Sequence, residues 1–361
     1  MTALIAIGTA KGLFLARSED GRGSWQISTP HHQMTEVYSV AIDTRRATPR
    51  VLAGMIASHF GPSVATSDDL GETWQEPDPA PIAFPEGTEA AVERVWQLTP
   101  GPASQPDRVY AGTQPSALWS SDDGGMTYQL VQALWDHPHR PTWGAGFGGQ
   151  AIHTILPHPT DPASILVAMS TGGVYRSSDG GASWAPSNTG IRVLFQPEEY
   201  PEYGQCVHKV ARDPVHPERL YLQNHGGVYR SDDGGGTWQS IADGLPSDFG
   251  FAMVSHPRQP DVIYNFPLEA DIKRFPVGRS CQVYRSQDAG KSWEALRTGL
   301  PGEGFYPTVL RDAMCVDNGD PAGVYFGTRS GEVYGSRDAG DTWSLVAAHL
   351  PAVLSVRAAD F

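Results

Sequence analysis

The stretch Ser177-Ser-Asp-Gly-Gly-Ala-Ser-Trp184 decides the fold, because its pattern, Ser-x-Asp-x-Gly-x-Thr/Ser-Trp/Tyr, recurs along the chain. Five further copies fit it well, at Ser67–Trp74, Ser121–Tyr128, Ser231–Trp238, Ser286–Trp293 and Ser336–Trp343. A seventh copy, Ser18–Trp25, is degenerate because Arg22 replaces the glycine. Neighbouring aspartates of the seven copies lie between 49 residues (Asp20 to Asp69) and 56 residues (Asp123 to Asp179) apart. A four-stranded propeller blade takes about 40–50 residues, so the period favours a β-propeller.

Each copy is interpreted as a tight turn held by its own side chains. The serine and aspartate oxygens are expected to accept hydrogen bonds from backbone N–H groups of the turn. The glycine supplies a backbone conformation that residues with side chains rarely adopt. The final Trp or Tyr begins the next strand and packs on the blade. Because the seven aspartates occupy one repeat position, we expect them to be structural rather than catalytic.

A second strand pattern lies upstream of each turn, beginning near residues 37, 95, 151, 207, 251, 311 and 354. The first such strand follows the first turn, and the last, Leu354–Phe361, has no turn after it. We therefore predict an all-β fold, a single seven-bladed β-propeller domain over residues 1–361 with four-stranded blades. The C-terminal strand should complete the sheet begun by three N-terminal strands, which leaves only short protected edges. Helix should make up less than a tenth of the chain.

The repeated turn resembles the Asp-box, or BNR, motif, which occurs in sialidases, sortilin-type receptors, some glucan-cleaving propellers and photosystem assembly factors. The chain is similar to bacterial proteins labelled sialidase-like or glycosyl hydrolase. The resemblance implies the propeller scaffold, which supports several chemistries. Sialidase activity itself is not expected, because sialidase propellers have six blades and an arginine in an N-terminal Arg-Ile-Pro-like segment. Here the N-terminal segment reads Ala6-Ile-Gly-Thr-Ala-Lys11.

Composition excludes several classes of partner. The net charge of −14 disfavours nucleic acid and anionic membrane surfaces. No apolar run approaches the roughly 18–20 residues that span a membrane. Three cysteines without close spacing are neither a disulfide framework nor a zinc knuckle. Reduced thiols and an N-terminus without the basic region of a signal peptide predict a cytoplasmic protein.

The segments that interrupt the repeat are the functional candidates, because binding residues concentrate on loops held by a rigid scaffold. Three of them are expected at one mouth of the channel: 135–150 before blade three, 195–206 before blade four and 304–307 before blade six. Hairpin insertions around 58–60 and 268–274 are further candidates. From these segments and the strand ends we expect ligand contacts from Tyr38, Trp96, His139, Arg140, Trp143, Lys209, Tyr306 and Arg311.

Aligning the innermost strands on their closing turns brings unequal residues to one repeat position, five residues upstream of the turn. That position holds Tyr38, His153, His208, Phe251, Asp312 and Ser355, with Trp96 or Gln97 in the second blade. Three interpretations of His153, His208 and Asp312 remain open. They form a hydrogen-bonded channel lining, they perform acid/base catalysis, or they bind one divalent metal ion. His59 or His225 would then supply a further metal ligand.

Further side chains near the mouth carry weaker signals. Cys206 and Cys315 flank the same position, so a Cys/His nucleophile is conceivable, although buried cysteines are usually inert. Trp143 and Phe147 would stack on a sugar ring or pack their loop. Glu198, Glu199 and Glu202 are solvated or serve as paired carboxylates.

The leading functional hypothesis is therefore a hydrolase or lyase that acts on a polar small molecule or glycoside in the central funnel. The alternative is a non-catalytic ligand-binding or assembly module. A divalent metal ion is the cofactor that the predicted set would hold. The expected partner is a small-molecule or carbohydrate ligand, and neither nucleic acid nor a membrane.

Overall fold

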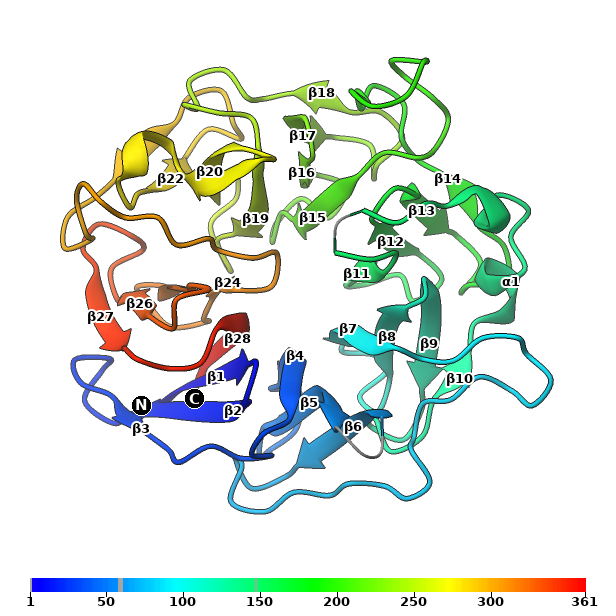
Figure 1. Ribbon diagram of the computed structural model, residues 1–361, viewed down its shortest axis with the longest axis horizontal. Helices are drawn as coiled ribbons and strands as arrows, with labels where there is room; N and C mark the ends of the chain where they lie inside the picture. Colours follow the sequence, from blue (N-terminus) through cyan, green and yellow to red (C-terminus); the bar gives the residue numbers. More distant parts are fainter. Residues whose placement is uncertain (1, 58–60, 147) are drawn as a thin grey trace.

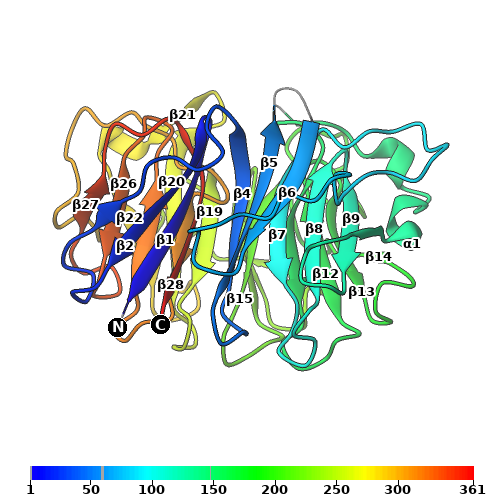
Figure 2. The ribbon, with the colours of Figure 1, turned by 90° about the horizontal axis from the view of Figure 1, so that it is seen from below.

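A computed structural model describes residues 2–57, 61–146 and 148–361. Seven antiparallel sheets stand around a central channel, and the two termini lie side by side in one of them (Figure 1). Seen from the side, the strands run along the channel, with the termini at one end and β21 at the other (Figure 2). The predicted seven-bladed, almost entirely β propeller is confirmed.

Blades one to four follow one another along the chain. Blade one consists of β4 (Glu36–Asp43), β5 (Arg50–Ala57) and β6 (Gly61–Ser67). Blade two consists of β7 (Arg94–Pro100), β8 (Val109–Gln114), β9 (Ala117–Ser121) and β10 (Gln129–Leu130). Blade three consists of β11 (Ile152–Pro157), β12 (Ile165–Met169), β13 (Gly173–Ser177) and β14 (Ala185–Pro186). Blade four consists of β15 (Val207–Arg212), β16 (Leu220–Asn224), β17 (Gly227–Ser231) and β18 (Gln239–Ser240).

The remaining blades complete the ring. Blade five consists of β19 (Gly250–Ser255), β20 (Ile263–Ala270), β21 (Lys273–Pro276), β22 (Val283–Ser286) and β23 (Glu294–Leu296). Blade six consists of β24 (Met314–Val316), β25 (Val324–Gly327), β26 (Val333–Ser336) and β27 (Ser344–Ala347). Blade seven consists of β28 (Val353–Asp360), β1 (Ala3–Thr9), β2 (Gly12–Ser18) and β3 (Gln26–Ile27), in that spatial order. The short helix α1 (Gln132–Trp135) and the 3₁₀ turn η1 (Arg140–Thr142) lie between blades two and three, and the 3₁₀ turn η2 (Val277–Arg279) lies within blade five.

Two blades depart from the four-stranded plan. In blade one the outermost strand is reduced to an isolated bridge between Thr66 and Gln75. In blade five, β21 adds a hairpin with β20 that extends beyond the other strands. This hairpin belongs to the insertion at 268–274 and stands at the end of the channel away from the termini (Figure 2).

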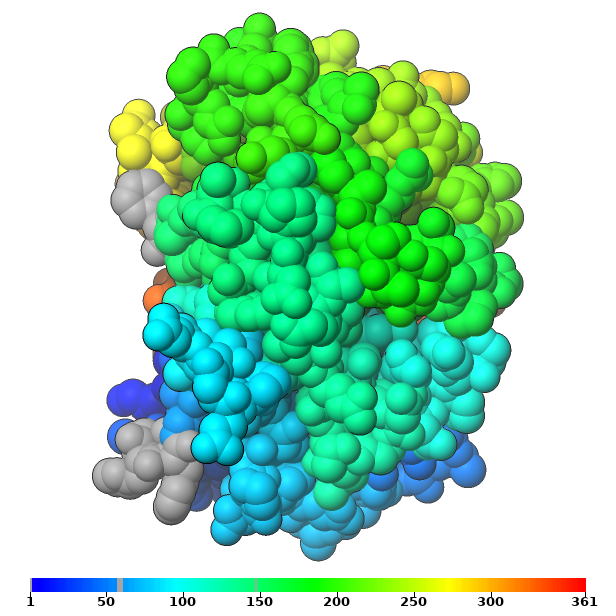
Figure 3. Space-filling view, turned by 90° about the vertical axis from the view of Figure 1, so that its right-hand side faces the viewer, coloured from blue at the N-terminus to red at the C-terminus, as the bar shows by residue number. Residues whose placement is uncertain are grey.

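The ring closes as predicted. The innermost strand of blade seven is β28, which pairs antiparallel with β1 from Ala3–Asp360 to Thr9–Val353. Buried apolar residues form one cluster at each of the seven junctions between neighbouring blades. In the space-filling side view, blades two, three and four occupy successive parts of the outer surface (Figure 3). None of the described helices is long and apolar enough to cross a membrane.

The repeated turns have the predicted hydrogen bonds. In the blade-three copy, Ser177 Oγ donates to Asp179 Oδ1 at 2.7 Å and accepts from the backbone N–H of Gly181 at 2.8 Å. The N–H of Ser183 donates to Asp179 Oδ1 at 2.9 Å. Hydrogen bonds from Ser183, chiefly its hydroxyl, lower the pKa of Asp179 to about 2. The glycine has a φ of +97°, and in the degenerate copy Arg22 adopts +68°. These aspartates therefore hold turns.

Candidate functional site

A β-bulge near one end of the innermost strand in blades one to four directs a side chain toward the channel mouth. The pairing shifts between Val37 and Ser39, between Val95 and Gln97, and at the matching points of blades three and four. A bulge leaves one residue outside the ladder and re-aims its side chain. The residues at these four bulges are Tyr38, Trp96, His153 and His208. The blade-two register, open between Trp96 and Gln97 from the sequence, is thus fixed at Trp96.

A cavity of about 730 Å³ lies at this mouth. Aromatic side chains line it from several blades: Tyr38, Trp96, Phe195 and Phe251. Three guanidinium groups also line it: Arg274, Arg311 and Arg329. The polar remainder includes Cys206, His208, His225, Asp271 and two threonines. The cavity therefore combines apolar ring faces with positive charge.

Arg311 is the central cation of this cavity. Its guanidinium carbon lies 5.6 Å from the ring centre of Trp96 and 5.1 Å from that of Phe251. Among the described residues its side chain has no hydrogen bond or ion pair, and its buried Nε lacks a hydrogen-bond partner. A guanidinium group that stacks on aromatic faces, with no hydrogen-bond acceptor among the described residues, keeps its donors available for an incoming anion.

His208 is buried and held in one orientation. Its Nδ1 lies 2.6 Å from the carbonyl oxygen of Gly250, which can only accept, so Nδ1 carries the proton. Its Nε2 lies 3.7 Å from Cys206 Sγ. Burial, reinforced by the charge of Arg311, holds the pKa of His208 well below its usual value. The ring is therefore neutral, with the lone pair of Nε2 on the Cys206 side.

The structure does not assemble the predicted set of His153, His208 and Asp312. His208 lines the cavity, whereas the fully buried His153 is not among the lining residues, and its ring centre lies 6.4 Å from that of Trp96. Asp312 accepts from Lys209 Nζ at 2.6 Å and is also paired with Arg357. Among the described residues, His208 therefore shares a potential ligand group with neither His153 nor Asp312.

Asp312 does not reach the predicted position beside His208, and the cause is local. β24 begins only at Met314, and Asp312 instead forms an isolated bridge with Ser355 while its carbonyl accepts from the N–H of Val356. Arg311 then takes the place at the mouth, and Asp312 is left within the channel. Burial alone would raise the pKa of Asp312, but the charges of Lys209 and Arg357 outweigh burial and hold it below its usual value. Its carboxylate is thus an ionised partner of two cations.

The predicted ligand contacts divide into two groups. Tyr38, Trp96 and Arg311 line the cavity, whereas Lys209 lies deeper, beside Asp312 and Gln97. The other four predicted contacts lie among outer loops. His139 stacks on Tyr203, Arg140 lies over Trp135, Trp143 donates to Tyr175, and Tyr306 is exposed beside Phe275. Outside the described residues lie His59 and Phe147.

The second cysteine and the three glutamates that the sequence suggests also lie apart from the cavity. Cys315 is buried in the core between blades six and seven, away from His208. Glu198, Glu199 and Glu202 are exposed or solvent-facing, and Glu199 pairs with Arg192 at 2.7 Å.

Sequence reasoning missed several residues that line the cavity, namely Asp271, Phe195 and the two threonines. The candidate segments 195–206 and 268–274 contain Phe195 and Asp271, so these interruptions of the repeat pointed to part of this group. An interruption of the repeat thus indicates where a blade is elaborated, although it does not indicate which of its side chains face the cavity.

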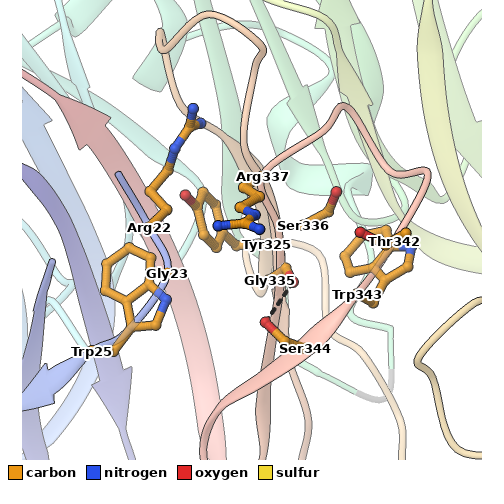
Figure 4. A pocket seen from close by; sticks show the side chains of 10 residues that line it. All are labelled: Arg22, Gly23, Trp25, Tyr325, Gly335, Ser336, Arg337, Thr342, Trp343 and Ser344. Carbon is orange, nitrogen blue, oxygen red and sulfur yellow. Dashed lines mark hydrogen bonds between the residues drawn. The ribbon is translucent and has the colours of Figure 1, made fainter. Parts of the chain in front are cut away.

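Two smaller cavities have structural explanations. One of about 220 Å³ lies between blades six and seven, where Arg22, Trp25 and Tyr325 surround it (Figure 4). There Arg22 donates to Asp317 at 3.0 Å, which joins a repeated turn to the neighbouring blade. Another of about 240 Å³ includes Lys209 and Arg357 and lies deeper in the channel. The paired Asp312 thus stands between this cavity and the mouth.

Comparisons with known proteins find xyloglucanases among the relatives of this chain. No protein-family model matches the chain. A xyloglucanase from a Paenibacillus species is 27% identical over 191 residues, which cover 49% of this chain and 17% of that protein. An oligoxyloglucan-reducing end-specific xyloglucanase of Emericella nidulans is 23% identical over 363 aligned positions, 88% of this chain and 43% of that protein.

A solved structure extends the likeness to the whole chain. The crystal structure of the GH74 xyloglucanase from Xanthomonas campestris matches with a TM-score of 0.63 and 17% identity, over 96% of this chain and 52% of that one. At this identity the likeness shows the propeller fold. The chain spans less than half the length of the two xyloglucanases matched by sequence.

Proposed function

We propose that the mouth cavity binds a carbohydrate that carries an acidic group, and that the protein acts on it as a glycoside hydrolase or a lyase. One observation carries the proposal: a cavity of about 730 Å³ places the rings of Trp96, Tyr38 and Phe251 beside three arginines. Ligand sites typically join apolar and aromatic walls with a few placed polar groups. The xyloglucanase relatives support a carbohydrate ligand.

The acidic group is inferred from local charge. The chain has a net charge of −14, yet among the described lining residues Asp271 is the one carboxylate against three guanidinium groups. Asp271 is itself within 3.6 Å of His225. A concave positive site in an acidic protein concentrates anions locally. Arginine binds carboxylates through two parallel hydrogen bonds, so Arg311, with its donors available, is the expected anchor.

His208 is the proposed acid/base group. Most glycoside hydrolases use two carboxylates on opposite sides of the scissile bond, and the described lining offers only Asp271. A neutral imidazole with Nε2 free of a proton can instead remove a proton from water or from a carbon atom next to an arginine-bound carboxylate. The first step belongs to a hydrolase and the second to a lyase.

One observation favours the alternative function, a non-catalytic binding module. Asp312, the carboxylate that the strand alignment places at the channel, is neutralised by Lys209 and Arg357. Asp312 therefore cannot supply a second catalytic carboxylate, and a propeller that only binds its ligand would not need one. In that case the same cavity and the same arginines would serve recognition alone. The finer labels of Asp-box family and sialidase-like protein stay proposals, and the seven blades disfavour the second.

Binding and turnover of acidic and neutral oligosaccharides test the proposal. We expect calorimetry to show saturable binding of uronate oligosaccharides, and Arg311→Gln to weaken it at least about tenfold, the loss of a charge-assisted hydrogen bond. Arg140→Gln, outside the cavity, is the matched control. Reducing-end release identifies a hydrolase, and an unsaturated product identifies a lyase. Equal binding of neutral and acidic sugars, or equal losses in the two variants, would contradict the acidic ligand.

A further inference from the structure

Three potential metal ligands meet at the mouth end of blade four. Cys206 directly precedes β15, His208 lies on β15, and His225 directly follows β16. The two strands pair there, since the N–H of His225 donates to the carbonyl of Cys206 at 2.9 Å. One ligand atom from each of the three residues lies within 4.8 Å of the other two. The pairing of β15 with β16 thus builds the group from two chain segments.

The spacing suits a tetrahedral ion. Zinc binds cysteine sulfur at about 2.3 Å and histidine nitrogen at about 2.0–2.1 Å, which separates the two ligand atoms by about 3.6 Å at a tetrahedral angle. Cys206 Sγ and His208 Nε2 are 3.7 Å apart. The rings of His208 and His225 lie edge to face, with centres 5.4 Å apart. Little movement is therefore needed to bring all three onto one ion.

The groups around the three residues orient them for metal binding. Gly250 holds the proton of His208 on Nδ1, which leaves Nε2 facing Cys206. Asp271 Oδ2 lies 3.6 Å from His225 Nε2, which leaves the other ring nitrogen of His225 for an ion. A carbonyl or carboxylate behind each ligating histidine is the usual arrangement of outer partners in metal sites.

We propose that Cys206, His208 and His225 bind one transition-metal ion, by ligand chemistry Zn²⁺, and leave a fourth position open to the mouth cavity. A thiolate with two imidazoles is a donor set typical of zinc rather than magnesium or calcium. Three protein ligands with an open position are typical of catalytic zinc. This inference relies on the proposed function only for the role of the open position. With the ion bound, Nε2 of His208 would be a ligand, and a metal-bound water would take over the base or nucleophile role proposed for that nitrogen.

The three ligands differ from the set predicted from sequence. Only His208 is retained from it, and His225 is the additional ligand that the sequence suggests. Cys206 replaces a carboxylate, because Asp312 is held in the channel by Lys209 and Arg357. The three ligands therefore all come from blade four.

Metal titration of tag-free protein tests the site independently of any sugar. After chelator treatment, we expect one equivalent of Co²⁺ to give a tetrahedral spectrum with a thiolate-to-cobalt band, and Zn²⁺ to displace it. Cys206→Ser should abolish the thiolate band, and His225→Ala should weaken binding at least about a hundredfold. Asp271→Asn should weaken it about 10–100-fold, as loss of an outer partner does.

Matched controls are available elsewhere in the chain. Cys281→Ser removes another buried thiol, and His216→Ala removes an exposed imidazole on the same blade. Both should bind Co²⁺ like the unaltered protein. Near-ultraviolet circular dichroism and thermal melting verify that each variant is folded, and Cys206→Ala replaces Cys206→Ser if the serine variant does not fold.

Two results for the Cys206 thiol would overturn the site. One is a cobalt spectrum that Cys206→Ser leaves unchanged. The other is alkylation of Cys206 by iodoacetamide at the same rate with and without Zn²⁺, which would favour a free thiol. One equivalent of zinc without sugar binding would refute the proposed function and leave the metal site standing. Sugar binding without metal would do the reverse.

Discussion

Replacement of Asp312 by Asn should destabilise the fold strongly. The carboxylate is buried and paired with Lys209 and Arg357, and the amide would leave two cations in the channel without their counter-ion. Removing one partner of a buried ion pair typically costs about 3–5 kcal/mol. For 361 residues at about 2.1 cal/mol/K each, the unfolding entropy is about 0.76 kcal/mol/K. The expected fall in Tm is therefore about 4–7 °C.

Differential scanning calorimetry measures this change directly. Asp341→Asn is the matched control, because Asp341 is largely exposed and pairs with Arg285 at the surface. Such surface pairs contribute about 0–1 kcal/mol, so its Tm should fall by no more than about 1 °C. The double variant Asp312→Asn/Lys209→Met should recover part of the loss, since it removes one unpaired cation. A change of less than about 1 °C for Asp312→Asn, or lost turnover at unchanged Tm, would refute the structural role.

The remaining predictions concern the scaffold. Hydrogen bonds in the folded state lower the pKa of Asp69 and Asp179 to about 2. The stabilisation by these two carboxylates is therefore complete above their unfolded pKa of about 4 and is lost as the pH falls toward 2. Melting curves from pH 6 to 2 should show this loss, and a Tm that stays flat would contradict it. Deletion of residues 353–361 should abolish the cooperative melt, because β1 loses a partner along its whole length; an unchanged melt would show that closure is unimportant. Gly190→Ala places a methyl group against the carbonyl oxygen of Trp238 at a φ of +95°. The variant should lower the free energy of unfolding, measured by chemical denaturation, by more than about 1 kcal/mol. In the control Gly302→Ala the added methyl group meets nothing within 4 Å, so little effect is expected.

The architecture could be predicted because each repeat contains its own local information. Ser177 and Asp179 bind backbone groups within the same turn, so their spacing in sequence already describes the turn. The alignment of innermost strands worked for Tyr38 and His208 for a similar reason. Closing turns are held by local acceptors such as His158 and Asp213, which bind N–H groups two or three residues later. A fixed distance from such a turn therefore marks a fixed height in the channel.

The site could be predicted only in part, because its decisive contacts join different strands or different blades. Asp312 shares the repeat position of His208, but its partners Lys209 and Arg357 belong to blades four and seven. No local pattern reports such pairing. The same holds for Cys206 and His225, which meet only because β15 and β16 pair. The turn at Ser67–Trp74 matches the repeat pattern well, so it does not explain why the outer strand of blade one is reduced to one bridge.

The pairing of β1 with β28 has a consequence for the order of biosynthesis. Residues 3–9 are synthesised long before residues 353–360, and until those are made one edge of their strand stays without its partner. During that time the backbone groups of this edge are open to any other extended segment. Blades one to six can form from contiguous segments, but the joining contact spans nearly the whole chain and carries the largest loop-closure entropy. At high concentration, the β28 segment of a second molecule is the best competitor for that edge, so exchange of this strand between chains is the characteristic way for this ring to misassemble.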